Sequence, residues 1–174
     1  MGANKAEVLY RGTPMVSRVA AALESCLRTV RIVLRPGQPN PTELPRIDDR
    51  HASRAAMVGI ASALRRAETD AVLIAACDLP ELEPRIVLAL LANAPLGGAP
   101  EIVAPRGPEG LEPLLAIYRV SLLPELERRI AVEQFGLRRL FDERETHAIP
   151  TALLRELDPS LASLHNANRP EDLR

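Results

Sequence analysis

The chain has 174 residues, a formal net charge of −1 and a pI of about 6.3, which suits one domain with its own hydrophobic core. This charge gives no electrostatic basis for binding nucleic acid or anionic lipid, and an aromatic content of 2% is too low for base-stacking surfaces. No apolar run reaches the roughly 18–20 residues of a membrane span, so we expect neither a nucleic-acid nor a membrane partner.

Cysteine and histidine usage argues against a disulfide framework and a zinc site. Cys26 and Cys77 are the only cysteines and do not form a CxxC pair, so we expect reduced thiols in a cytoplasmic protein. The histidines are far apart and show no zinc-ligand spacing.

The first third of the chain alternates helical and strand-like segments. Thr13 and Pro14 are typical of a helix N-cap and first helical residue, and they precede an apolar helical face. Residues 30–34 predict a β-branched strand. A second helix is expected from its N-cap, Ser53, to about Arg66.

An aspartate follows the next apolar segment. Residues 72–76 are short, apolar and bounded, as in a strand covered on both faces. Pro80 stops this strand, and Pro84 stands where a helix could begin. Asp78 should therefore lie at the carboxyl end of a buried strand, the edge where ligands bind in open α/β sheets.

The second half of the chain continues the alternation. Strands are expected at 101–104 and 111–119, and the second runs antiparallel if Glu109 and Gly110 make a tight turn. Two further amphipathic helices are expected at 122–130 and 135–141. The pattern predicts an α/β fold, with a mostly parallel sheet, an antiparallel strand and helices on both faces.

Four short motifs resemble those of one known family. Residues 1–6 (MGANKA) are similar to the end of a phosphate loop, and residues 77–80 (CDLP) to a C-D-[ML]-P motif. Residues 112–119 (EPLLAIYR) and 166–173 (NANRPEDL) are similar to x-P-L-x-A-x-Y-R and N-x-N-T-P-E-D-L. Together, and in this order, the motifs resemble the molybdenum cofactor guanylyltransferases, within the MobA-like nucleotidyltransferases. The resemblance implies a single MobA-like NTP transferase domain over 1–174, with a three-layer Rossmann-like fold.

The resemblance also implies a reaction. In this family the terminal phosphate of molybdopterin attacks the α-phosphorus of GTP, and pyrophosphate leaves. Such a transfer depends on charge neutralisation and in-line positioning, so Mg²⁺ is the expected cofactor. The expected partners are GTP and molybdopterin (the molybdenum cofactor), and the expected state is a monomer or weak oligomer.

The resemblance assigns roles to individual residues. Asp78 is the expected metal and nucleotide ligand, Lys5 the expected triphosphate contact, and these two are the expected catalytic residues. The further expected contacts are Gly2, Asp48 and Gly59 with the nucleotide, and Asn166 and Asn168 on the acceptor side.

Local structural roles remain open for the same residues. Asp78 could instead cap its turn through an Asx-type bond, and Lys5 could be a solvated lysine. Asp49 replaces Asp48 if the register shifts by one, and both could simply form a turn. The two C-terminal asparagines could likewise be turn residues.

Two departures from the family pattern raise further hypotheses. Residues 55–60 (AAMVGI) stand where the family has G-P-L-A-G-I, so the nucleotide-bordering loop could run on as helix. The chain also starts inside the family's phosphate loop, so we expect the first strand and most of the glycine-rich cradle to be missing and activity to be poor. Our hypothesis is that the natural start codon lies further upstream. A cytidylyltransferase that uses CTP and a degenerate non-catalytic binding protein are the alternative functions.

Overall fold

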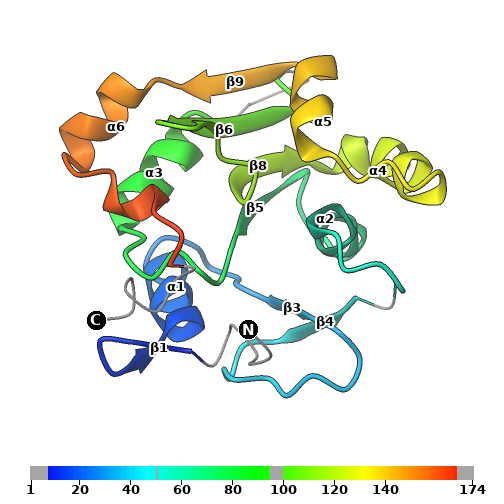
Figure 1. Cartoon of the computed structure of the whole chain (residues 1–174), viewed down its shortest axis with the longest axis horizontal. Helices are drawn as coiled ribbons and strands as arrows, with labels where there is room; N and C mark the ends of the chain where they lie inside the picture. The colour runs from blue at the N-terminus through cyan, green and yellow to red at the C-terminus, as the bar shows by residue number, and fades with distance from the viewer. Residues whose placement is uncertain (1–7, 50, 95–99, 168–174) are drawn as a thin grey trace.

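The computed structural model describes residues 8–49, 51–94 and 100–167 (Figure 1). The expectations for Gly2, Lys5 and Asn168 therefore concern positions outside the described residues.

A mixed sheet forms the centre of the fold. Its strands, in spatial order, are β5 (Ala71–Ala75), β8 (Leu115–Arg119), β6 (Ile102–Gly107) and β9 (Thr146–Ile149). β8 is antiparallel to β5 and to β6, whereas β9 is parallel to β6. Strands β5, β6 and β9 therefore run in one direction and end at the same edge. This confirms the expected mostly parallel sheet with an antiparallel strand.

A short hairpin extends β6. β7 (Gly110–Leu111) pairs with its end, and Gly107 is opposite Gly110, which has φ +127°. The turn therefore consists of Pro108 and Glu109, one residue earlier than the expected Glu109 and Gly110.

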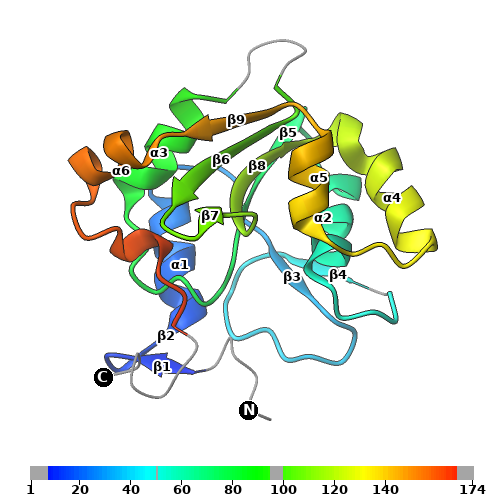
Figure 2. The same ribbon diagram turned by 45° about the horizontal axis from the view of Figure 1, so that its top comes forward.

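Helices cover both faces of the sheet (Figures 1 and 2). One face carries α1 (Met15–Glu24), α3 (Pro84–Ala92) and α6 (Thr151–Leu157). The other carries α2 (Ala56–Arg65), α4 (Leu123–Ala131) and α5 (Leu137–Glu143). Short 3₁₀ turns lie at η2 (Val120–Leu122) and η3 (Ala162–Leu164). None of the helices in the described part of the chain is long and apolar enough to cross a membrane.

The sheet separates two hydrophobic cores. Along β8, Leu115 and Ile117 pack into the core under α1, α3 and α6, whereas Ala116 and Tyr118 pack into the core under α2, α4 and α5. This alternation follows from the two-residue period of a strand, and it makes the layer arrangement three deep.

Two smaller strand pairs lie beside the central sheet (Figure 2). β3 (Ile32–Leu34) is parallel to β4 (Arg46–Asp48), so these strands also end on one side. β1 (Leu9–Tyr10) and β2 (Thr13–Pro14) form an antiparallel hairpin. Within the described ranges, β5 pairs only with β8, and β3 only with β4.

Several local expectations need correction. Thr13 is not an N-cap, because it pairs with Tyr10 in the hairpin, and α1 begins at Met15. Ser53 is not an N-cap either, because its hydroxyl accepts a hydrogen bond from the backbone N of Ala55 in the turn before α2. All five residues of β5 are half-buried rather than buried, since one edge of that strand has no partner among the described residues.

Candidate functional site

The carboxyl edge of the central sheet brings two of the motifs together. Ala75 in β5 is paired with Leu115 in β8. Beyond this pair, the backbone N of Ala76 donates to the carbonyl of Leu114 at 2.7 Å. The CDLP segment that leaves β5 therefore runs beside the EPLL segment that enters β8.

The C-terminal motif is bonded to the same edge. The backbone N of Ala167 donates to the carbonyl of Asp78 at 2.9 Å, and the neighbouring Asn166 is exposed. Four residues earlier, the Ser163 hydroxyl accepts from the backbone N of Glu83 at 3.1 Å. The edge thus unites three of the motifs, although Asp78 and Ala167 are 89 positions apart along the chain.

A buried carboxylate holds this C-terminal segment in shape. Asp158 is 2% exposed, and its Oδ2 accepts from the backbone N of Ser163 at 2.8 Å. Burial raises the pKa of Asp158, but the hydrogen bonds from Ser163 and Ser160 outweigh burial and bring it below its usual value. The segment that carries Asn166 therefore rests on a fixed turn.

Asp78 is half-buried in the turn that follows β5. The next two residues, Leu79 and Pro80, are buried, and Arg18 of α1 donates to the Pro80 carbonyl at 2.7 Å. In the described ranges, no three His, Cys, Asp or Glu side chains gather in a group that could hold a metal. A single carboxylate at a fixed sheet edge is nevertheless what Mg²⁺ commonly uses when substrate phosphates and waters supply its other ligands.

A cluster around Tyr10 contacts the loop between β5 and α3, residues 76–83, which we call the Asp78 loop. The Tyr10 hydroxyl donates to Glu81 Oε1 at 2.7 Å, and Arg11 forms an ion pair with the same carboxylate oxygen at 2.9 Å. The guanidinium groups of Arg11 and Arg18 lie 5.0 and 5.4 Å from the centre of the Tyr10 ring. Sequence reasoning missed this cluster, because no spacing pattern connects residues 10 and 81.

Glu112 is a second carboxylate at this edge. It is half-buried, and burial, followed by the nearby charge of Glu109, raises its pKa above the usual value. No ion pair or side-chain hydrogen bond engages its carboxylate within the part of the chain that the structure describes. In the sequence, Glu112 was only the variable first position of the EPLLAIYR motif.

The two aspartates at the end of β4 have local partners. Asp48 Oδ1 accepts from Arg46 Nε at 2.6 Å, at the exposed surface. Asp49 is 7% exposed, and its Oδ1 accepts from the backbone N of His51 at 3.2 Å and from the Ser62 hydroxyl at 3.5 Å. Asp49 therefore connects the end of β4 to α2. Among the described residues, no hydrogen bond or ion pair joins either aspartate to the Asp78 loop.

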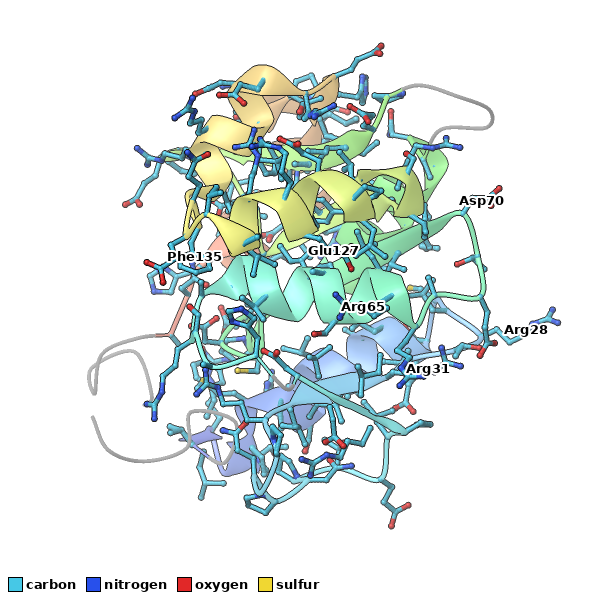
Figure 3. The ribbon with its side chains drawn as sticks, turned by 90° about the vertical axis from the view of Figure 1, so that its right-hand side faces the viewer. Arg28, Arg31, Arg65, Asp70, Glu127 and Phe135 are labelled. Atoms are coloured by element: carbon cyan, nitrogen blue, oxygen red, sulfur yellow. The ribbon has the colours of Figure 1, made fainter. Side chains whose placement is uncertain are left out.

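Two open grooves border the β3–β4 pair. The larger, about 840 Å³, lies along β4, α2 and α4. Figure 3 shows Arg65 of α2 and Glu127 of α4 turned toward each other there, with 2.7 Å between Nη2 and Oε1. Arg31, below Arg65 in that view, pairs with Glu68. Because its arginines are largely paired with carboxylates, this groove offers little net charge.

The smaller groove, about 720 Å³, lies at the carboxyl ends of β3 and β4. Arg35, His51 and Arg54 line it, together with Gln38 and Asp49. The His51 Nδ1 accepts a hydrogen bond from the backbone N of Ser53, so this ring is oriented by the loop before α2. Its basic lining suits a ligand with anionic or carbonyl groups.

Gly59 lies in the first turns of α2 rather than in a loop. Ala55 is extended, with ψ 141°, and the helix begins at Ala56. The nucleotide-bordering loop of the family is therefore helical here from Ala56 onward, as alanine in place of Gly and Pro permits. No atom lies within 4 Å of the position that a Cβ on Gly59 would take.

A family model described as the MobA-like NTP transferase domain matches residues 1–149. The chain is 28% identical to the molybdenum cofactor guanylyltransferase of Desulfosudis oleivorans, over 99% of this chain and 85% of that protein. It is 31% identical to a probable molybdenum cofactor guanylyltransferase of Nostoc sp., over 99% of this chain and 82% of that protein.

A solved structure shows the same likeness. The crystal structure of molybdopterin-guanine dinucleotide biosynthesis protein A from Archaeoglobus fulgidus superposes with a TM-score of 0.79 and 28% identity. The match covers 99% of this chain and 88% of that one.

Proposed function

Since the chain belongs to the MobA-like NTP transferase family, we propose that it transfers GMP from GTP to the molybdopterin form of the molybdenum cofactor and releases pyrophosphate. The names of its relatives from Desulfosudis and Nostoc support GTP as the donor. One observation carries the proposal in this molecule: the Ala167–Asp78 hydrogen bond joins the C-terminal motif to the carboxyl edge of β5.

Asp78 would hold Mg²⁺ jointly with the substrate phosphates. When bound, the cation supplies positive charge that stabilises the triphosphate and the departing pyrophosphate. Asp78 sits where β5, the buried Leu79 and Pro80, and the Arg18–Pro80 bond fix the backbone, so its carboxylate needs little reordering before it binds.

The transfer needs no protein nucleophile. An oxygen of the acceptor's terminal phosphate forms the new bond to the α-phosphorus, and the bond from that phosphorus to the bridging oxygen of pyrophosphate breaks. The chain then has to place two phosphates in line. We assign Gly2, Lys5, Asp48 and Gly59 to the nucleotide side and Asn166 and Asn168 to the acceptor side. Lys5 would contact the triphosphate as a point charge.

The test is guanylate transfer with the purified chain, GTP, Mg²⁺ and molybdopterin. We expect Mg²⁺-dependent release of pyrophosphate and formation of the guanylated cofactor, with GTP used in preference to CTP. Calorimetry of GTP binding with and without Mg²⁺ complements this assay, because a protein that binds GTP but shows no transfer is a binding protein rather than an enzyme. Equal use of CTP, or no Mg²⁺-dependent GTP binding, would contradict the proposal.

We also place the protein in the cytoplasm as a monomer or weak oligomer. Size-exclusion chromatography with light scattering at micromolar concentration tests the second part. A stable oligomer at that concentration would contradict it.

A further inference from the structure

We propose that Glu112 binds the 2-amino-4-oxopyrimidine edge of the acceptor's pterin ring and so selects the acceptor. This inference rests on the proposed function, because it takes molybdopterin as the acceptor.

The first support is position. Ala76 and Leu114 share the last backbone hydrogen bond between the two segments, at 2.7 Å. Asp78 lies two residues after Ala76, and Glu112 lies two residues before Leu114. Two residues of extended chain span roughly 7 Å, so Asp78 and Glu112 both lie about that far beyond the Ala76–Leu114 bond, at the same edge of the sheet.

The second support is the way the carboxylate is seated. A Cβ on Gly107 would lie 2.6 Å from Glu112 Oε1 and 3.4 Å from a methyl group of Leu164. The absence of a side chain on Gly107 therefore leaves the space that the Glu112 carboxylate occupies. The same space borders Leu164, in the C-terminal segment whose Ala167 is bonded to Asp78.

The third support is that Glu112 lacks a partner. A half-buried carboxylate without a cation or a hydrogen-bond donor loses part of its hydration and gains no hydrogen bond within the protein. Neighbouring structural carboxylates do have partners: Asp158 accepts from Ser163, and Glu81 accepts from Tyr10. Glu112 differs from them, because within the described residues its acceptor atoms remain available to a ligand.

The chemistry of the ring matches this acceptor. The ring N–H and the exocyclic amino group of a 2-amino-4-oxopyrimidine are adjacent donors that face one way, and a carboxylate can accept from both at once. Guanine presents the same pair of donors, so GTP is the other possible source of this edge. The pterin is favoured because Glu112 borders the segment that carries Asn166, on the side assigned to the acceptor.

The experiment measures ring binding without turnover. Pterin and lumazine, an analogue with oxygen in place of the 2-amino group, are titrated by ligand fluorescence against the full chain and against Glu112→Gln. The wild type should prefer pterin by about 10- to 100-fold, as a charge-assisted hydrogen bond implies. Glu112→Gln should remove that preference while keeping the melting temperature.

A second arm identifies the source of the ring edge. GTP and ITP, which lacks the 2-amino group, are titrated against the same two proteins. Loss of the GTP preference in Glu112→Gln, with pterin binding intact, would overturn the acceptor assignment in favour of guanine. Unchanged preferences in both arms would overturn the role of Glu112 altogether. Because neither arm needs catalysis, a failed transfer assay leaves this result interpretable.

Gly107→Ala is the matched variant that keeps the charge. The three atoms nearest to the new methyl group are two at the end of the flexible Glu112 side chain and one methyl carbon of Leu164, so the fold should tolerate it. It should push the Glu112 carboxylate aside and weaken pterin binding several-fold. Wild-type pterin affinity in this variant would contradict the seating described above.

Discussion

Aspartates lie both at the carboxyl edge of the central sheet and at the carboxyl edge of the β3–β4 pair. At the end of β4, Asp48 pairs with Arg46 of the same strand, and the next residue, Asp49, is buried against Ser62 and the backbone of His51. After β5, Asp78 stands where the hairpin near Tyr10, the entry to β8 and the C-terminal segment converge. An aspartate at a strand end therefore marks a candidate site only when distant segments meet around it.

The largest effect that this comparison predicts is on catalysis at Asp78. Asp78→Asn keeps the shape of the side chain but removes the charge that would hold Mg²⁺, so transfer should fall by more than about 100-fold. Pyrophosphate release under saturating GTP measures the loss, and denaturant unfolding should show a stability close to wild type. Near-normal turnover in Asp78→Asn would remove Asp78 from the metal site.

Asp49→Ala should act on stability instead. It deprives the Ser62 hydroxyl and the His51 backbone N of a buried acceptor, which should cost about 1–3 kcal/mol in the free energy of unfolding. Urea unfolding measures this. Asp70→Ala is the control, because Asp70 is exposed (Figure 3) and should change the stability by less than about 0.5 kcal/mol. Equal stabilities for the two variants would deny Asp49 its structural role.

Gly59→Ala tests whether the α2 face near β4 contacts the nucleotide. The added methyl group meets no atom within 4 Å, so the helix should gain about 0.5–1 kcal/mol of stability. If the proposed nucleotide contact exists, the KM for GTP should rise while the KM for the acceptor stays constant. A stabilised protein with unchanged GTP kinetics would remove Gly59 from the nucleotide site.

The smallest stability effect is expected at Asp48. Its pair with Arg46 is exposed, and such pairs contribute a few tenths of a kcal/mol. Asp48→Asn should therefore barely change unfolding, and any rise in the KM for GTP would report a nucleotide contact directly. If stability falls by more than about 1 kcal/mol, Asp48 is structural like Asp49.

The central elements were predictable because their patterns are strong. The apolar run that became β5, the proline that begins α3 and the amphipathic period of α4 all matched the structure. β9 and α6 were missed. β9 is four residues long and includes Thr146 and His147, so its strand character comes from pairing with β6 rather than from an apolar run.

The candidate site was predictable only in part. Asp78 could be found because its strand, its prolines and a family motif coincide at one place. The choice between Asp48 and Asp49 could not be made from the sequence. The Ser62 hydroxyl that donates a hydrogen bond to Asp49 lies 13 residues later, on a helix. The role of Glu112 could not be predicted, because its carboxylate occupies a space bordered by Gly107 and Leu164. Only the folded chain brings those three residues together.

The bond between Ala167 and Asp78 has a consequence for protein synthesis. Translation makes the residues around Asp78 long before it makes Ala167, so the edge stays incomplete until the chain has been synthesised through Ala167. A prematurely terminated product would contain β5 and its aspartate yet lack the segment that closes over them. Such a fragment should lack a complete edge around Asp78, which ties the onset of the proposed function to synthesis of the chain through Ala167.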